Sequence, residues 1–147
     1  MVTMQRRPSD PSCRSAPSDP PPQAKFSREP ETVGHAREYA LEVIQRTAPD
    51  LAADHVSDVQ LIVSELVTNA LRYGGEPGDS VAVVVEVSLD RARVEVHDTS
   101  RRRPKFKPAS KERQRGRGLF IVDALAIAWG VDDRPLGKIV WAELKWT

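Results

Sequence analysis

The sequence predicts an α+β fold, a two-layer sandwich in which a mixed, mostly antiparallel sheet carries its helices on one face. Apolar residues recur at helical spacing in two successive segments, about 32–47 and 54–73. They alternate with other residues in the next two segments, 81–89 and 92–97, which are separated only by a tight turn. A further helical segment and two short strands follow, and this order is typical of helices packed on one face of a sheet.

The first part of this fold is expected to be a short edge strand near Phe26 and a helix that begins near Thr32, whose hydroxyl suits an N-cap position. A loop at residues 48–50, with the sequence Ala-Pro-Asp, is expected to end this helix. Its predicted apolar stripe consists of Val33, Ala36, Ala40, Leu41 and Ile44.

The second helix shows the clearest pattern in the chain. Asp54 can cap it, and Gly74 and Gly75 are expected to stop it after Tyr73. Its predicted apolar stripe consists of Val59, Ile62, Val63, Leu66, Val67, Ala70 and Leu71.

The second half of the chain is expected to start with a hairpin that turns at Asp90 and Arg91. A third helix is predicted from Gly118 to Trp129, where Gly130 would break it. The last two strands are predicted near Val131 and over 139–146. The tryptophans Trp129, Trp141 and Trp146 are interpreted as packing residues.

Composition predicts one folded domain, residues 25–147, behind a disordered arm, residues 1–24, which is rich in Pro and Ser and poor in large apolar residues. The apolar runs are too short to cross a bilayer, and no apolar stretch follows the first arginines as in a secretory signal. Cys13 is the one cysteine of the sequence, so no intramolecular disulfide is possible. These features favour a cytoplasmic protein.

Charge is distributed unevenly, although the net charge is only +1. Residues 101–117 hold nine Lys or Arg and a single acid, Glu112, whereas the rest of the chain holds thirteen basic and twenty acidic residues. A mildly acidic body with one basic loop favours an anionic ligand or an acidic partner. A nucleic-acid interface is disfavoured, because Phe106 is the one aromatic residue of the loop and no helix combines basic and base-reading side chains.

Glu65 and Asn69 lie four residues apart on the second predicted helix. They are separated by about 40° around the helix axis, so both leave it along one edge, at the margin of the apolar stripe. An amide oxygen suits Mg²⁺, which takes few protein ligands besides water and phosphate oxygens. A carboxylate beside it can accept a proton from an attacking hydroxyl. Taken alone, the pair also fits an ordinary surface glutamate and a helix-end asparagine.

Two further features follow in the chain. Asp98 ends a strand, where its carboxylate can accept a hydrogen bond from an exocyclic amine such as that of adenine or can simply start a turn. Gly116, Arg117 and Gly118 open the third predicted helix, where backbone N–H groups can approach an anion closely. His97 adjoins Asp98 but alternates to the other strand face, and it is interpreted as a structural histidine.

These motifs, in this order, resemble those of the GHKL ATPase domains, also called the Bergerat fold, and in particular the anti-sigma factor serine/threonine kinases and related stand-alone ATP-binding regulators of actinomycetes. VSELVTNALRYGG, from residue 63, resembles the N box of that family. VEVHDTS, from residue 94, and GRGLFIVDALAIAWG, from residue 116, resemble its two glycine boxes. The resemblance covers about residues 25–146.

The resemblance implies ATP and Mg²⁺ as cofactors, with Glu65 as general base, Asn69 as magnesium ligand and Asp98 as the adenine reader. Residues 101–115 would form the lid over the ATP, and the cofactor-binding turn beside the phosphates would consist of Gly116, Arg117, Gly118 and Leu119. The implied partners are proteins, a sigma factor or an anti-sigma antagonist whose serine would be phosphorylated, and the chain would be a possible homodimer. Neither a membrane nor a nucleic acid is an implied partner.

One departure from the family pattern leaves a second function open. The first glycine box of the family has glycines two and four residues after its aspartate, and this chain has Ser100 and Arg102 there. Neither residue takes up left-handed backbone angles as readily as glycine. The alternative is therefore a nucleotide-gated binding module that sequesters a sigma factor without phosphotransfer.

Overall fold

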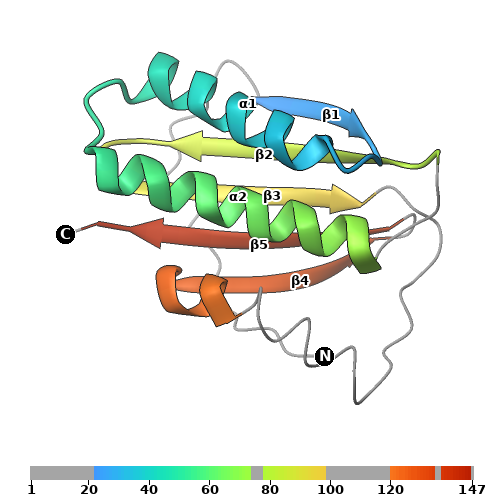
Figure 1. The fold of residues 1–147 in the computed structure, drawn as a ribbon. Helices are drawn as coiled ribbons and strands as arrows, with labels where there is room; N and C mark the ends of the chain where they lie inside the picture. Colours follow the sequence, from blue (N-terminus) through green and yellow to red (C-terminus); the bar gives the residue numbers. More distant parts are fainter. Residues whose placement is uncertain (1–21, 74–77, 99–119, 135–136, 147) are drawn as a thin grey trace.

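The computed structural model describes residues 22–73, 78–98, 120–134 and 137–146. Two long helices lie on the same face of one five-stranded sheet (Figure 1). The predicted α+β class, with a sheet and a layer of helices on one face, is confirmed. The elements follow the order β1 (Gln23–Ser27), α1 (Thr32–Thr47), α2 (Ala53–Tyr73), β2 (Ser80–Val87), β3 (Arg91–Asp98), β4 (Ala128–Arg134) and β5 (Gly137–Lys145).

The sheet has the strand order β1-β2-β3-β5-β4, and each neighbouring pair among these strands is antiparallel. The register places Val83 opposite Val96 and Val96 opposite Val140, so valines line the centre of the helix-facing side. Strand β1 forms one edge, as predicted for the segment around Phe26. It begins at Gln23, so it includes the last two residues that the sequence assigned to the arm.

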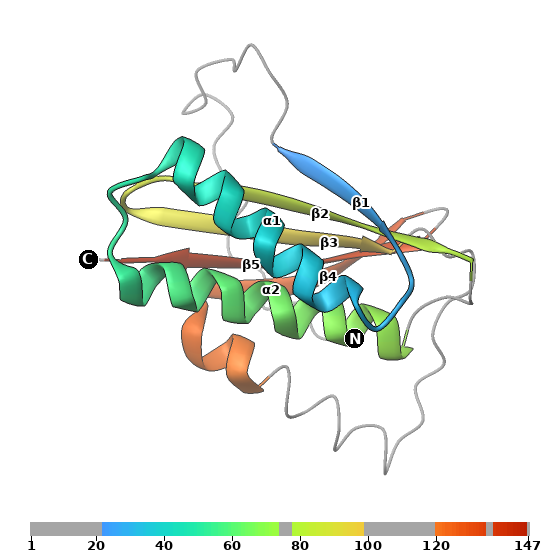
Figure 2. The ribbon, with the colours of Figure 1, turned by 45° about the horizontal axis from the view of Figure 1, so that its top comes forward.

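The core lies between this side of the sheet and the two helices, which pack against each other as well (Figure 2). Alternating strand residues and helix residues three or four apart meet there, as their periodicities require. The largest fully buried side chains are Ile62, Leu66, Leu144, Val43, Val59, Val63, Val67, Val81, Val83, Val85, Val94 and Val96. Trp146 is also buried, and its ring stacks on that of His55 with centroids 4.5 Å apart.

The two long helices do not begin with the N-cap residues that the sequence predicted. Glu31 is the N-cap residue of α1, and Thr32 instead donates its hydroxyl to the carbonyl oxygen of Ser27 at 2.5 Å. Helix α2 begins at Ala53, which places Asp54 in its first turn, where a negative charge favours the helix dipole.

The third predicted helix is wrong at its C-terminal end. Residues 120–125 are helical, but 128–134 form strand β4 instead of continuing to Trp129. Pairing with β5 explains the difference, because Trp129 and Val131 lie opposite Ala142 and Val140. Gly130 lies opposite Trp141, where a glycine leaves room for the indole. The predicted start of this helix lies outside the described residues.

Candidate functional site

Three elements, two of which carry predicted site residues, end at the same end of the sheet. Strand β1 ends at Ser27, helix α2 at Tyr73 and strand β3 at Asp98, and the two ribbon views show these ends on one side of the molecule (Figures 1 and 2). Antiparallel pairing explains the agreement of β1 and β3, because both run opposite to β2, which lies between them.

Glu65 and Asn69 lie on α2, and each is half-buried. Their neighbours Leu66 and Ala70 are almost completely buried in the core. The pair therefore lies at the margin of the buried stripe, which is the position that the helical spacing predicted. Their roles as general base and magnesium ligand stay predictions.

Asp98 is a charged residue inside the core side of the sheet, with only 5% of its surface exposed. It lies opposite Val81 on β2 and, by strand alternation, on the same face as the buried Val94 and Val96. Its carboxylate consequently points to the side of the sheet that α1 and α2 cover. A buried carboxylate needs a charged or hydrogen-bonding partner, since isolated ions are costly to bury.

Arg28 supplies one such partner and also reaches the end of α2. Its Nη1 lies 3.7 Å from Oδ1 of Asp98, and both side chains are at least nine-tenths buried. Its Nη2 donates hydrogen bonds to the carbonyl oxygens of Ala70 at 2.5 Å and Leu71 at 3.0 Å. Arg28 thereby connects Asp98 with the helix end that directly follows Asn69.

Sequence reasoning missed Arg28. It is a single arginine in the short loop between β1 and α1, and its contacts on α2 are 42 and 43 residues away in the chain. Local spacing therefore carried no sign of it. The one available clue was indirect, since a buried aspartate at a strand end requires a cation from elsewhere in the fold.

The remaining predicted site residues, Gly116, Arg117, Gly118 and Leu119, lie outside the described residues, as does the basic stretch 101–115. The same holds for Ser100 and Arg102, the two departures from the first glycine box. The phosphate-binding turn and the lid consequently stay predictions from the sequence.

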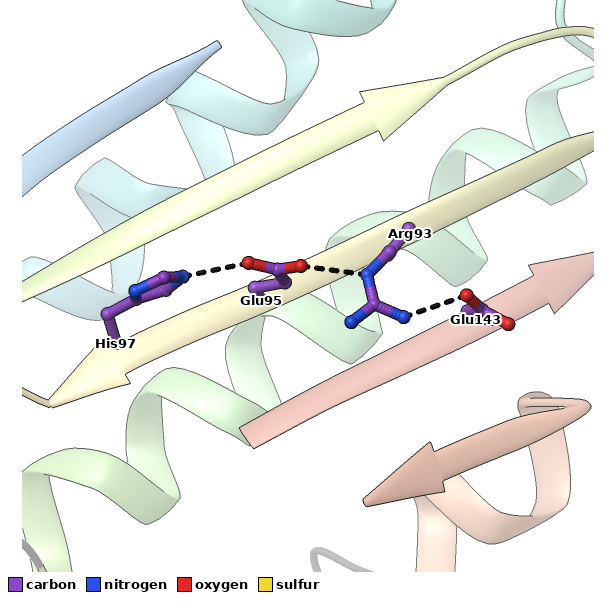
Figure 3. Close-up of polar contacts among 4 residues, drawn as sticks. All are labelled: Arg93, Glu95, His97 and Glu143. Carbon is purple, nitrogen blue, oxygen red and sulfur yellow. Dashed lines mark hydrogen bonds and ion pairs between the residues drawn. The ribbon is translucent and has the colours of Figure 1, made fainter. Parts of the chain in front are cut away.

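A second polar group lies on the opposite face of the sheet, away from the helices, and Figure 3 shows it. His97 and Glu95 share a hydrogen bond of 2.8 Å, and Arg93 bridges Glu95 at 2.8 Å and Glu143 at 2.7 Å. The guanidinium of Arg93 also lies 4.7 Å from the ring centroid of Trp141. His97 thus lies on the face of the sheet opposite to Asp98 and forms a hydrogen bond with Glu95, which agrees with its interpretation as a structural histidine.

Charge pairing in this group affects Glu95 most. The hydrogen bond with His97 and, after it, the bonds with Arg93 lower the pKa of Glu95 to about 2, against the opposing effect of burial. The carboxylate therefore stays charged at neutral pH. It belongs to the sheet surface opposite the candidate site, so we assign it to stability.

The donors near the end of α2 fit a magnesium ion that a triphosphate brings with it. Mg²⁺ takes one or two protein oxygens and otherwise waters and phosphates. Asn69 offers one half-buried amide oxygen, with the half-buried carboxylate of Glu65 one helical turn away. Among the described residues no cluster of three or more His, Cys, Asp or Glu side chains is arranged to hold a metal by itself.

The sequence profile of the histidine kinase-like ATPase domain matches residues 26–144, which is most of the chain. The chain belongs to this family. Its described elements accordingly form the fold of a GHKL ATPase domain, and domains of this family bind ATP with Mg²⁺. The described part of this ATPase domain contains no helix that is both long and apolar enough to span a membrane.

Among solved structures, the ATPase domain is similar to the crystal structure of the RsbU and RsbW domains of Rv1364c from Mycobacterium tuberculosis. The TM-score is 0.58 at 17% sequence identity, and the match covers 86% of this chain. The chain spans only about a third of the other structure, of which 33% is covered. At this identity the similarity concerns the fold alone. No curated protein sequence matches the chain.

Proposed function

We propose that this ATPase domain binds Mg-ATP and acts as a serine/threonine protein kinase of the anti-sigma type, which phosphorylates a serine of an anti-sigma antagonist. One observation carries the proposal. The helix that bears Glu65 and Asn69 is joined at its end, through Arg28, to the buried carboxylate of Asp98. Arg28 thereby connects the elements that carry the residues to which we assign the roles of proton acceptor, magnesium ligand and adenine reader.

Each residue has a defined task in the proposed reaction. Asp98 accepts a hydrogen bond from the exocyclic amine of adenine, which orients the nucleotide. Asn69 holds the magnesium ion, which neutralises charge on the phosphates when bound. Glu65 accepts the proton of the serine hydroxyl while the serine oxygen attacks the γ-phosphorus of ATP, and ADP leaves. Catalysis of phosphoryl transfer rests mainly on such positioning and charge neutralisation.

The proposed protein partner rests on two arguments. The sequence motifs resemble those of anti-sigma factor kinases, and the solved structure of similar fold includes an RsbW domain. Both arguments favour a sigma factor, an anti-sigma antagonist or both as binding partners. The chain itself offers a mildly acidic body beside one basic segment, 101–117, and such asymmetry favours charged protein partners.

Phosphotransfer tests this function directly. Wild type and Glu65→Gln are incubated with radiolabelled Mg-ATP and a panel of anti-sigma antagonists, and labelled serine is measured. Loss of a general base lowers the rate by about 10²–10⁴-fold. Glu38→Gln, which alters an exposed glutamate on α1, serves as the matched control and leaves the rate unchanged. If Glu65→Gln labels the antagonist as fast as wild type does, the assigned mechanism is wrong.

The second candidate function is a nucleotide-gated module that sequesters a sigma factor without phosphotransfer. Ser100 and Arg102, which replace the two glycines of the family pattern, favour it because neither residue type takes up left-handed backbone angles as readily as glycine. Isothermal titration separates the two candidates. Mg-ATP binding that changes the affinity for a sigma factor, with no labelled serine on any antagonist, selects the module over the kinase.

A further inference from the structure

The loop that carries Arg28 is tied at both ends. The hydroxyl of Thr32 donates to the carbonyl oxygen of Ser27 at 2.5 Å, and the backbone N–H of Thr32 donates to the carbonyl oxygen of Glu29 at 3.0 Å. Thr32 is itself 2% exposed, so this closure is protected from water. The loop therefore presents the Arg28 side chain from a fixed base.

From this base, one guanidinium reaches two elements of the candidate site. The carbonyl groups of Ala70 and Leu71 lie in the last turn of α2, where helix carbonyls lack partners within the helix and a cation is favourable. The other end of the same guanidinium faces Asp98. One rigid, planar guanidinium thus lies between the end of α2, to which it donates hydrogen bonds, and the carboxylate, with which it forms an ion pair at 3.7 Å.

We propose that Arg28 is a positioning residue for nucleotide recognition. Its guanidinium, held by the end of α2 and paired with Asp98, sets the preference for adenine over purines that carry a carbonyl group in place of the exocyclic amine. The proposal rests on the proposed function, since it assumes that Asp98 reads the base. Arg28 acts through Asp98 and through the end of the Asn69-bearing helix, and it has no chemical role in phosphotransfer.

The expected selectivity follows from hydrogen-bond chemistry. The carboxylate of Asp98 lies 3.7 Å from Nη1 of Arg28, and a carboxylate accepts hydrogen bonds and donates none. Adenine offers an exocyclic N–H donor, whereas hypoxanthine, like guanine, offers a carbonyl acceptor at that position. A fixed carboxylate therefore binds ATP and rejects inosine triphosphate. Without the guanidinium of Arg28, the carboxylate of Asp98 is held less firmly. It then distinguishes less between ATP and inosine triphosphate.

Titration calorimetry with Mg-ATP and with Mg-inosine triphosphate tests the proposal on Arg28→Met, Arg28→Lys and wild type. Arg28→Lys retains a cation beside Asp98, so it keeps a foldable variant in the series even if the unpaired carboxylate of Arg28→Met prevents folding. We expect both variants to lose about tenfold or more of the preference for ATP, as for one hydrogen bond to a charged group. Arg91→Met, at an exposed arginine of β3, retains the wild-type preference.

A purely structural role predicts a different result. If Arg28 only stabilises the fold, the affinities for both nucleotides fall together and their ratio stays at the wild-type value, which overturns the proposal. A wild-type ratio combined with unchanged affinities in Arg28→Lys overturns it as well. If the wild-type protein binds neither nucleotide, the proposed function itself is refuted. This outcome is distinct from the two above, because it is seen with wild type alone.

Hydrogen exchange on the nucleotide-free protein gives an independent readout. We expect faster amide exchange in Arg28→Lys than in wild type at both the last turn of α2 and the end of β3, because one side chain joins them. Arg91→Met leaves both segments at the wild-type rate. Unchanged exchange at either segment in Arg28→Lys contradicts a positioning role.

Discussion

Replacing Gly130 by alanine should destabilise the protein through a single steric contact. An added Cβ would lie 2.9 Å from Cζ2 of Trp141 and 3.1 Å from its Cε2 and Nε1. Carbon atoms prefer about 3.5–4.0 Å, so the ring has to move by about 0.5 Å. Trp141 is 6% exposed and the guanidinium of Arg93 lies against its ring, which leaves the ring little freedom to move.

The expected magnitude combines two effects. Overpacking of this kind costs about 1–3 kcal/mol. Replacing glycine in a strand recovers about 0.5–1 kcal/mol of backbone entropy. We therefore expect Gly130→Ala to lower the free energy of unfolding by roughly 1–2 kcal/mol. Urea denaturation followed by circular dichroism measures this difference, and an unchanged m-value shows that the unfolding transition is the same.

Gly34 provides the matched control. It lies on the exposed side of α1, and an added Cβ there meets no atom within 4 Å. The same substitution should raise the free energy of unfolding by about 0.5–1 kcal/mol, because alanine favours the helix. The two alanine variants thus differ in sign. If Gly130→Ala stabilises the protein as much as Gly34→Ala does, the assigned contact with Trp141 is refuted.

Two further predictions concern stability. The hydrogen bonds with His97 and Arg93 hold the pKa of Glu95 at about 2 in the folded protein, below its ordinary value of 4.5. The charged carboxylate therefore stabilises the folded state fully above pH 4.5, and this contribution disappears as the pH falls through about 2. After allowance for solvent screening, this contribution amounts to about 1–2 kcal/mol. Urea titrations should show that the free energy of unfolding of wild type exceeds that of Glu95→Gln by a difference that shrinks by this amount between about pH 6 and about pH 2. A difference that does not change with pH contradicts the pairing. On α2, Leu66→Ala should cost about 2–5 kcal/mol because the side chain is 1% exposed, whereas Leu61→Ala, at 40% exposure, should cost well under half as much; equal costs contradict the burial assigned to the two leucines.

The sequence predicts the hairpin of β2 and β3 well, because valines at alternate positions and a tight turn are both local signals. The same holds for α2, whose apolar stripe from Val59 to Leu71 fits one helical period. Glu65 and Asn69 lie on that helix, so their position at the margin of the core follows from the stripe alone.

Other features depend on contacts that spacing cannot supply. The run from Ala124 to Val131 fits a helical and a strand period about equally, and the partner strand β5 decides for a strand from Ala128 onward. Arg28 has no local signal at all, since it meets Ala70 and Asp98 only after α2 and β3 have packed. Side chains that join distant elements are therefore the part of a site that sequence reasoning is most prone to miss.

The strand order also constrains how the chain folds during synthesis. Residues 137–145 form β5, an inner strand between β3 and β4, although they follow the other four described strands in the chain. Among the described strands, β4 pairs with β5 alone, so β4 cannot join the sheet before β5 has been synthesised. A nascent chain stalled before Gly137 should expose the apolar surfaces of α2 and β3 and depend on chaperones, whereas synthesis through Lys145 should let the five described strands assemble.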